Sequence, residues 1–304
     1  MRSPSAPATP AVPHVGAALD PGWRACVPAA WLEGWRPEPF ALDGGTTEVV
    51  AMGAGEPIVL VPPLPGYKEA WLAVAASLAR SHRVVAFDLR SRFGARPSWD
   101  AMLRDFERLL DAYAPGAATI VGHSLGGALA QRWALARPDR VRALVLSSTF
   151  AKVTNPPGNL YARFIEQPLL IAAQRLLPDA PARALARTMA RHGRWVYDTR
   201  CDDAMLAFVR HCMRHTTAAT AGSAIALAAA HDTRATVARI AAPTLVLVGE
   251  REPAFYPPAA RELARTIPGA ELRVSPGASH LHPLTNPQWF VETVEEWLAT
   301  LPAR

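Results

Sequence analysis

The sequence is short of lysine, and this shortage bears on possible partners. Lys68 and Lys152 are its only lysines, so the net charge of +6 at pH 7 and the pI of about 9.7 come from arginine. The arginines are dispersed, with no Lys/Arg run and no interleaved aromatic platform. We therefore expect no nucleic-acid partner.

Cysteine and long apolar runs are also scarce. Cys26, Cys201 and Cys212 lack C-x-x-C spacing, which argues against a zinc site and is typical of free thiols in a reducing compartment. No run approaches the ~18 apolar residues that cross a membrane, and the N-terminus lacks the apolar segment of a signal peptide. We expect a cytoplasmic protein with no integral membrane segment.

The composition is that of a folded enzyme-sized chain. Half of the 304 residues are apolar and 19% are charged, which is enough to form a sizeable core. Residues 1–36 form a Pro/Ala-rich N-terminal extension, whose first dozen residues we expect to be disordered. Trp23, Trp31 and Trp35 are expected to pack this extension onto the body.

Strand and helix patterns alternate along most of the chain, which predicts an α/β fold with a mostly parallel, doubly wound sheet. The segments that predict strands are 40–42, 46–52, 57–61, 83–87, 117–121, 141–146, 244–249 and 271–274. From 151 to 235 only helical patterns occur, at 161–177, 181–194, 203–214 and 217–230. We interpret this block as a helical cap over the carboxyl edge of the sheet, where ligands bind in open α/β folds.

The stretch Gly122-His123-Ser124-Leu125-Gly126-Gly127 lies between a predicted strand and a predicted helix. This is the context of a G-x-S-x-G nucleophile elbow, a sharp turn that presents the serine hydroxyl. Serine needs a base within hydrogen-bond reach, and that base needs a carboxylate to orient it. We expect His123 to be a packing residue rather than a second base.

The last predicted strand is followed by Gly277-Ala278-Ser279-His280, which makes His280 the best candidate base; His282 competes with it. The carboxylate should follow the 244–249 strand, where Glu250 and Glu252 are both available. The histidines of the helical block have no ligand spacing backed by carboxylates, so we expect no metal; they are His192, His211, His215 and His231.

Three of these motifs together resemble the α/β-hydrolase fold, in the form of a capped serine esterase or lipase. The resemblance covers roughly residues 38–304 and rests on the elbow, on the 243–249 strand, and on Gly277 to His280 with Pro287 seven residues after the histidine. Asp88-Leu89-Arg90 also matches a family motif, and we expect Asp88 to be structural. The resemblance divides the chain into an extension (1–36), a core (37–150 and 236–304) and a helical cap (151–235).

The resemblance implies a catalytic triad of Ser124, Glu252 and His280. The family usually has aspartate where this chain has Glu252, which leaves Glu250 as an alternative. The family also has His-Gly where this chain has Pro62-Pro63.

Two backbone N–H groups should form an oxyanion hole. Leu125 supplies one, at the start of the helix after the nucleophile. Proline has no N–H, so between Val61 and Gly66 only Leu64 can supply the other.

These residues predict a serine hydrolase that cleaves a carboxylic ester, lactone or thioester through an acyl-enzyme on Ser124, with no cofactor and with a small acyl substrate as partner. A carbon–carbon bond hydrolase and an acyltransferase with the same triad are alternatives. A non-catalytic binding protein on the same fold is an alternative of another class. Acyl chain length, leaving group and oligomeric state stay open.

Overall fold

The structure, a computed structural model, describes residues 21–43, 45–89, 98–153, 160–191, 201–214 and 216–302. The first dozen residues, for which we expect disorder, lie outside the described ranges. So do parts of the predicted cap, including His192 and His215.

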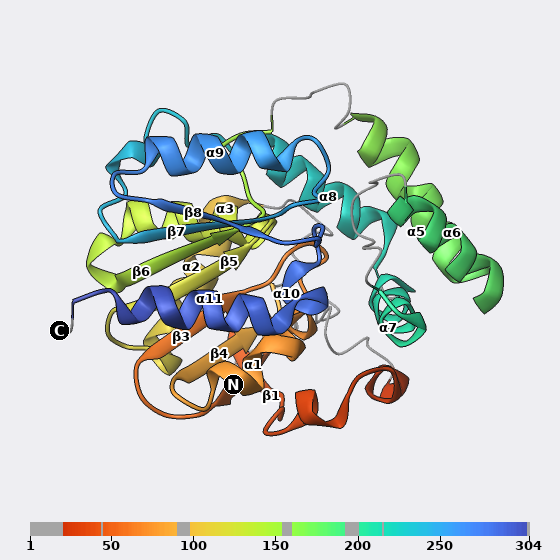
Figure 1. The fold of residues 1–304 in the computed structure, drawn as a ribbon, viewed down its shortest axis with the longest axis horizontal. Helices are drawn as coiled ribbons and strands as arrows, with labels where there is room; N and C mark the ends of the chain where they lie inside the picture. Colours follow the sequence, from red (N-terminus) through yellow and green to blue (C-terminus); the bar gives the residue numbers. More distant parts are fainter. Residues whose placement is uncertain are drawn as a thin grey trace, which may run out of the picture.

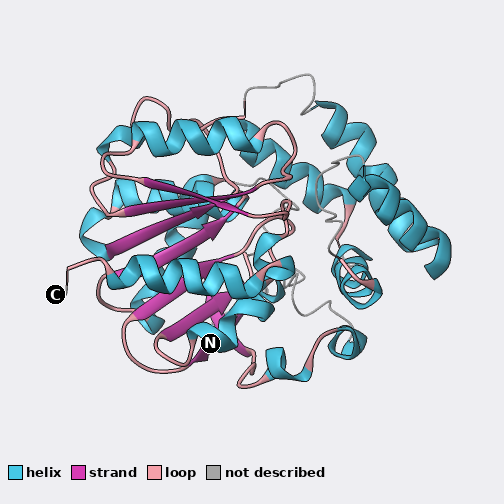
Figure 2. Cartoon of the chain, in the orientation of Figure 1, coloured by secondary structure: helices cyan, strands magenta, loops and turns pink. Residues whose placement is uncertain are grey.

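The strands of the described chain, magenta in Figure 2, form one sheet. It has eight strands in the order β1-β2-β4-β3-β5-β6-β7-β8. They are β1 (Glu38–Leu42), β2 (Gly45–Met52), β3 (Pro57–Val61), β4 (Arg83–Phe87), β5 (Ala118–His123), β6 (Val141–Ser147), β7 (Thr244–Gly249) and β8 (Glu271–Ser275). Strand β2 pairs antiparallel with β1 and β4, and all other pairs are parallel. The predicted mostly parallel α/β sheet is confirmed.

Helices cover both faces of this sheet (Figure 1). One core cluster joins the sheet to α2 (Trp99–Tyr113), α3 (Leu125–Ala136) and α9 (Tyr256–Thr266), and the other joins it to α1 (Leu72–Leu78) and α11 (Pro287–Ala299). In β3, Val59 and Val61 face the first cluster, whereas Ile58 and Leu60 face the second. A strand buried on both faces must be apolar at every position, which is why these strands are continuous apolar runs.

Between β6 and β7 the described chain contains helices and no sheet strand. They are a π-helix (Ala162–Glu166), α5 (Gln167–Leu176), α6 (Asp179–Arg191), α7 (Asp203–Arg214), α8 (Ala218–Ala230) and a 3-10 helix (Val237–Arg239). We call α5 to α8 the inserted helices. In Figure 1 they lie beyond the carboxyl ends of the parallel strands, and α8 runs from there back toward the core.

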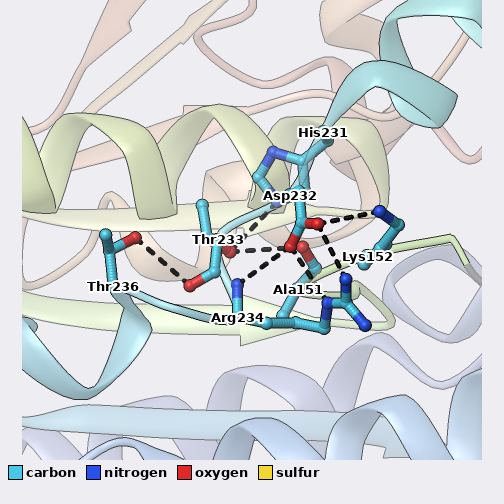
Figure 3. A network of polar contacts seen from close by, with 7 residues as sticks. All are labelled: Ala151, Lys152, His231, Asp232, Thr233, Arg234 and Thr236. Atoms are coloured by element: carbon cyan, nitrogen blue, oxygen red, sulfur yellow. Dashed lines mark hydrogen bonds and ion pairs between the residues drawn. The ribbon is translucent and has the colours of Figure 1, made fainter.

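The two ends of this insertion lie side by side at the core (Figure 3). Lys152 and Asp232 form an antiparallel bridge, and Lys152 Nζ lies 2.8 Å from Asp232 Oδ2. Thr233 N donates to Ala151 O at 2.9 Å. Gln131 of α3 bonds to both ends, because its Nε2 donates to Phe150 O and its Oε1 accepts from Thr233 Oγ1.

The described part of the N-terminal extension packs on α7 of the inserted helices and on α1 of the core. It forms two 3-10 helices, Pro21–Cys26 and Ala29–Leu32. Trp23 and Trp35 are buried, and the Trp23 ring centroid lies 6.0 Å from that of Phe208 in α7. At these two positions the tryptophans pack the extension onto the body, as expected, whereas Trp31 is only partly buried.

Candidate active site

Ser124 lies at a sharp turn between β5 and α3. Its backbone has φ 54° and ψ −117°, a combination that is strained for a non-glycine residue. The turn is held on both sides: Ser124 N donates to Ser147 O at 2.9 Å, and Ser124 O accepts from Thr149 Oγ1 at 2.7 Å. The residue is 8% exposed. The elbow geometry that the G-x-S-x-G motif requires is therefore present.

Glycine at position 126 lets the loop after β3 approach the start of α3. A Cβ at Gly126 would lie 2.3 Å from Val61 O and 2.6 Å from Pro62 O, closer than side chains tolerate. Leu64 and Leu125 belong to the two segments that meet here. Among the described residues, neither of their N–H groups has a backbone hydrogen-bond acceptor.

The loop that carries Leu64 is anchored by a buried charged cluster. Lys68 N donates to Asp88 Oδ1 at 2.8 Å, and Lys68 Nζ contacts Glu48, Glu69 and Asp88 at 2.7, 2.9 and 3.2 Å. Leu89 N donates to Gly66 O at 2.9 Å. Asp88 thus has the structural environment that the sequence predicts.

Burial governs the titration of this cluster. It raises the pKa of Glu69 to about 7, with a contribution from the charge of Asp88. It also raises the pKa of Asp88 to about 6, against the attraction of Lys68. Burial opposes the charge of Lys68, but Asp88 and Glu69 outweigh it and raise the pKa of Lys68.

Glu252 and His280 come together from the loops after β7 and β8. His280 Nδ1 lies 3.0 Å from Glu252 Oε2, and the two side chains are 6% and 0% exposed. Gly249 permits this approach, because a Cβ there would lie 2.5 Å from Ala278 O. Burial favours the neutral acid, but His280, His282 and Ser148 outweigh it and lower the pKa of Glu252. The carboxylate is therefore ionised at neutral pH.

Glu250, the alternative acid, is exposed and has a different partner. Its Oε2 accepts from Gly277 N at 2.6 Å. The structure thus pairs His280 with Glu252, and it uses Glu250 to hold the backbone of the loop that leads to the histidine.

His282, the competing base, lies on the other side of the Glu252 carboxylate. It is fully buried, and its Nε2 lies 2.9 Å from Ser147 Oγ and 3.0 Å from Ser148 Oγ. Burial lowers the pKa of His282 to about 4. His282 is therefore neutral at pH 7 and bonded to serines rather than to a carboxylate.

Two rings flank His280. The His123 centroid lies 4.9 Å away, and the Tyr256 centroid 4.3 Å away. Burial, with the charges of His280 and His282, lowers the pKa of His123 well below its usual range, so this packing ring stays neutral. The Tyr256 phenol also hydrogen-bonds to Ser124, and burial raises its pKa. Tyr256 therefore links the serine to the histidine.

Sequence reasoning missed Tyr256 and Ser148. Ser148 is the residue directly after β6, and its hydroxyl donates to Glu252 Oε1. The available signal was the polar pair Ser147-Ser148 at the end of an apolar run. Polar residues there meet those of neighbouring strands, because the carboxyl ends of parallel strands lie at one edge.

Comparison with known proteins identifies the family. Residues 56–287 match the alpha/beta hydrolase fold family. The chain belongs to the α/β-hydrolase fold family. A pimeloyl-[acyl-carrier protein] methyl ester esterase of Chromobacterium violaceum is 30% identical over 253 residues, which cover 83% of this chain and 98% of the esterase.

Two further proteins are similar to this α/β hydrolase. A 2-hydroxy-6-oxo-2,4-heptadienoate hydrolase of Pseudomonas putida is 38% identical over 121 residues, 35% of this chain and 42% of that enzyme. A solved structure of a hydrolase from Pseudomonas aeruginosa PA01 superposes with a TM-score of 0.70 at 27% identity, covering 87% of this chain and 99% of its own. The chain is thus an enzyme of the hydrolase class.

An apolar cavity of about 70 Å³ lies between the Leu64 loop and the inserted helices. Its walls come from the loop after β3, from α7 and from the segment after His280: Pro63, Leu64, Pro65, Tyr67, Ala70, Phe208, Val209, Cys212, Met213, Leu281 and Leu284. A second, wider cavity of about 420 Å³ lies between α7 and the N-terminal extension, and Leu284 lines both. Within the described ranges, no helix of this α/β hydrolase is long and apolar enough to span a membrane.

Proposed function

We propose that this α/β hydrolase cleaves a carboxylic ester, lactone or thioester through an acyl-enzyme on Ser124. The observation that carries the proposal is the pairing of His280 Nδ1 with Glu252 Oε2 at 3.0 Å, and the strained elbow at Ser124 supports it. Because Nδ1 donates to the carboxylate, Nε2 of the neutral imidazole carries the lone pair of a general base.

In this mechanism Ser124 Oγ attacks the carbonyl carbon while His280 Nε2 takes the serine proton. The resulting oxyanion accepts hydrogen bonds from the N–H groups of Leu64 and Leu125. His280 then protonates the leaving alcohol or thiol as its bond to the carbonyl carbon breaks. Water, deprotonated by His280, cleaves the acyl-enzyme and regenerates Ser124. Glu252 stabilises the imidazolium that forms in each half-reaction.

Residues 151–235 serve as the cap in this proposal. The apolar 70 Å³ cavity beside Leu64 is the candidate acyl site, since Leu64 would hold the carbonyl oxygen at its edge. The cavity is about half the size of an engineered apolar cavity that admits benzene. It therefore favours short acyl chains in the wild-type enzyme.

A fluorophosphonate probe tests the nucleophile, and p-nitrophenyl esters of graded length test the reaction. We expect the probe to label Ser124 and to abolish turnover of p-nitrophenyl acetate and butyrate. Ser124→Ala should show neither labelling nor turnover. A wild-type protein that is neither labelled nor active on any ester, lactone or thioester would support the non-catalytic binding protein instead.

Carbon–carbon bond hydrolysis is the second candidate, favoured by the partial similarity to the Pseudomonas putida hydrolase, whose name describes a dienoate substrate. Product analysis separates the candidates: an esterase releases an alcohol, whereas a carbon–carbon hydrolase splits a 2-hydroxy-6-oxo-dienoate into two fragments. Turnover of the dienoate at a higher kcat/KM than any ester would favour the second candidate.

A further inference from the structure

Two side chains behind the candidate triad, His282 and Ser148, extend its Glu252–His280 pair into a continuous hydrogen-bonded path. His282 Nε2 lies 3.0 Å from Ser148 Oγ, Ser148 donates to Glu252 Oε1, and the other carboxylate oxygen faces His280 Nδ1 at 3.0 Å. His282 and Ser148 are fully buried, and the Glu252 side chain is 0% exposed. The path thus lies inside the protein, where water cannot replace a missing partner.

The direction of the Ser148 hydrogen bond follows from the charge of Glu252. A carboxylate only accepts, so the single Ser148 hydroxyl proton must point to Oε1. The Ser148 oxygen is then left as an acceptor, which the neutral imidazole of His282 satisfies with its proton on Nε2; the same N–H also faces Ser147 Oγ at 2.9 Å. His282 Nδ1 has no partner among the described residues. Nδ1 then carries only a lone pair, and burying an unpaired lone pair costs less free energy than burying an unpaired N–H.

Two features of this chain explain why such a path is useful. Glutamate has one more rotatable bond than the aspartate usual in the family, so its carboxylate needs more restraint. Ser148 has φ 45°, in the left-handed region that non-glycine residues seldom occupy. Strain of this kind persists where the surrounding structure requires a particular side-chain position.

We propose that His282 and Ser148 are positioning residues for Glu252: His282 donates to Ser148, and Ser148 donates to Oε1, which holds Oε2 against His280. This inference rests on the proposed function for its effect on catalysis, but the path itself does not. Neither residue is expected to touch the substrate.

Ser148→Gly is the most informative variant, because it removes the hydroxyl while glycine adopts the positive φ without strain. We expect kcat on a p-nitrophenyl ester to fall about ten- to a hundredfold, the loss typical of a hydrogen bond to a charged group. KM should change less than about twofold, since the substrate site is intact. The fall in kcat at an unchanged KM, rather than the melting temperature, separates this role from a structural one.

Two further variants test the direction of the path. His282→Gln keeps an N–H donor near the Nε2 position and should retain most of the activity, whereas His282→Leu should resemble Ser148→Gly. Ser275→Ala is the matched control: Ser275 is also a fully buried serine at the end of a strand, and it accepts from Asn286 Nδ2 at 3.1 Å. We expect its kcat to equal that of the wild type.

Histidine ¹⁵N NMR tests the path without any substrate. We expect His282 to be neutral with its proton on Nε2 at pH 7. A proton on Nδ1, or a kcat for Ser148→Gly equal to that of the wild type on an active enzyme, would overturn the inference. Absence of any hydrolytic activity together with an Nε2–H tautomer would instead count against the proposed function while leaving the path intact.

Discussion

Replacing Glu69 with glutamine should stabilise the protein above neutral pH. The Glu69 carboxylate lies 2.9 Å from Lys68 Nζ, but that ammonium also contacts Glu48 and Asp88. Glu69 Oε2 has no hydrogen-bond partner within the described chain. Burial and the charge of Asp88 raise the pKa of Glu69 to about 7, compared with 4.5 for an ordinary glutamate. Ionised Glu69 is thus unfavourable in the folded state.

The magnitude follows from the linkage between proton binding and folding. Between about pH 4.5 and 7 the folded protein keeps a proton on Glu69 that the unfolded chain has lost, so stability falls as the pH rises through this window. One pKa unit is about 1.4 kcal/mol, which gives a loss of about 3 kcal/mol at pH 8 and about 1 kcal/mol at pH 5. Glutamine resembles the neutral acid and avoids this loss.

Urea unfolding followed by circular dichroism at pH 5 and pH 8 measures the effect. We expect Glu69→Gln to raise the free energy of unfolding by about 2 kcal/mol more at pH 8 than at pH 5. Glu48→Gln is the control, since it removes another partner of Lys68 from a side chain that is 31% exposed; it should not stabilise. An equal change for Glu69→Gln at both pH values, or a loss of stability at pH 8, would refute the reasoning.

Four further predictions concern the candidate site. Ser124→Ala should lower kcat on p-nitrophenyl esters at least about 10³-fold while urea unfolding stays close to that of the wild type. Glu252→Gln should lower kcat about 10³- to 10⁴-fold and Glu250→Gln only slightly; the reverse order would make Glu250 the acid. Tyr256→Phe should lower kcat about three- to tenfold, because it removes the bond to Ser124 but keeps the ring; an unchanged kcat would contradict this role. Leu284→Ala should join the two cavities and raise kcat/KM for octanoyl relative to butyryl esters by about tenfold; an unchanged ratio would show that the second cavity takes no acyl chain.

Local pattern predicts the core of this fold well, because its strands are buried on both faces. The apolar runs at 57–61 and 83–87 are β3 and β4 at the same residues. The four-residue helix α10 (His282–Thr285) was not predicted, since one turn is too short for a periodic signal. The order of the strands was also not predicted: β3 lies between β4 and β5, and only the folded chain reveals this.

Some residues of the candidate site could likewise be predicted from local sequence, and others could not. Ser124 and His280 follow from local motifs, and the structure shows the turn and the pairing that those motifs imply. The role of Ser148 depends on β6 lying between β5 and β7, which no local pattern contains. Glu250 and Glu252 are two residues apart in one loop, so only the resemblance favoured Glu252 before the side-chain directions were known.

At the junction shown in Figure 3, the chain leaves the core for the inserted helices and returns to it at an adjacent position. Residues paired across an antiparallel bridge have Cα atoms about 5 Å apart, so a short turn could connect Lys152 to Asp232 without displacing β6 or β7. The entropy of closing such a loop grows only slowly with its length, and the core therefore tolerates insertions of different size at this point. Gln131 ties both ends to the helix that starts at the nucleophile. The inserted helices are in this sense an exchangeable module, which can vary while the strands of the core keep their places.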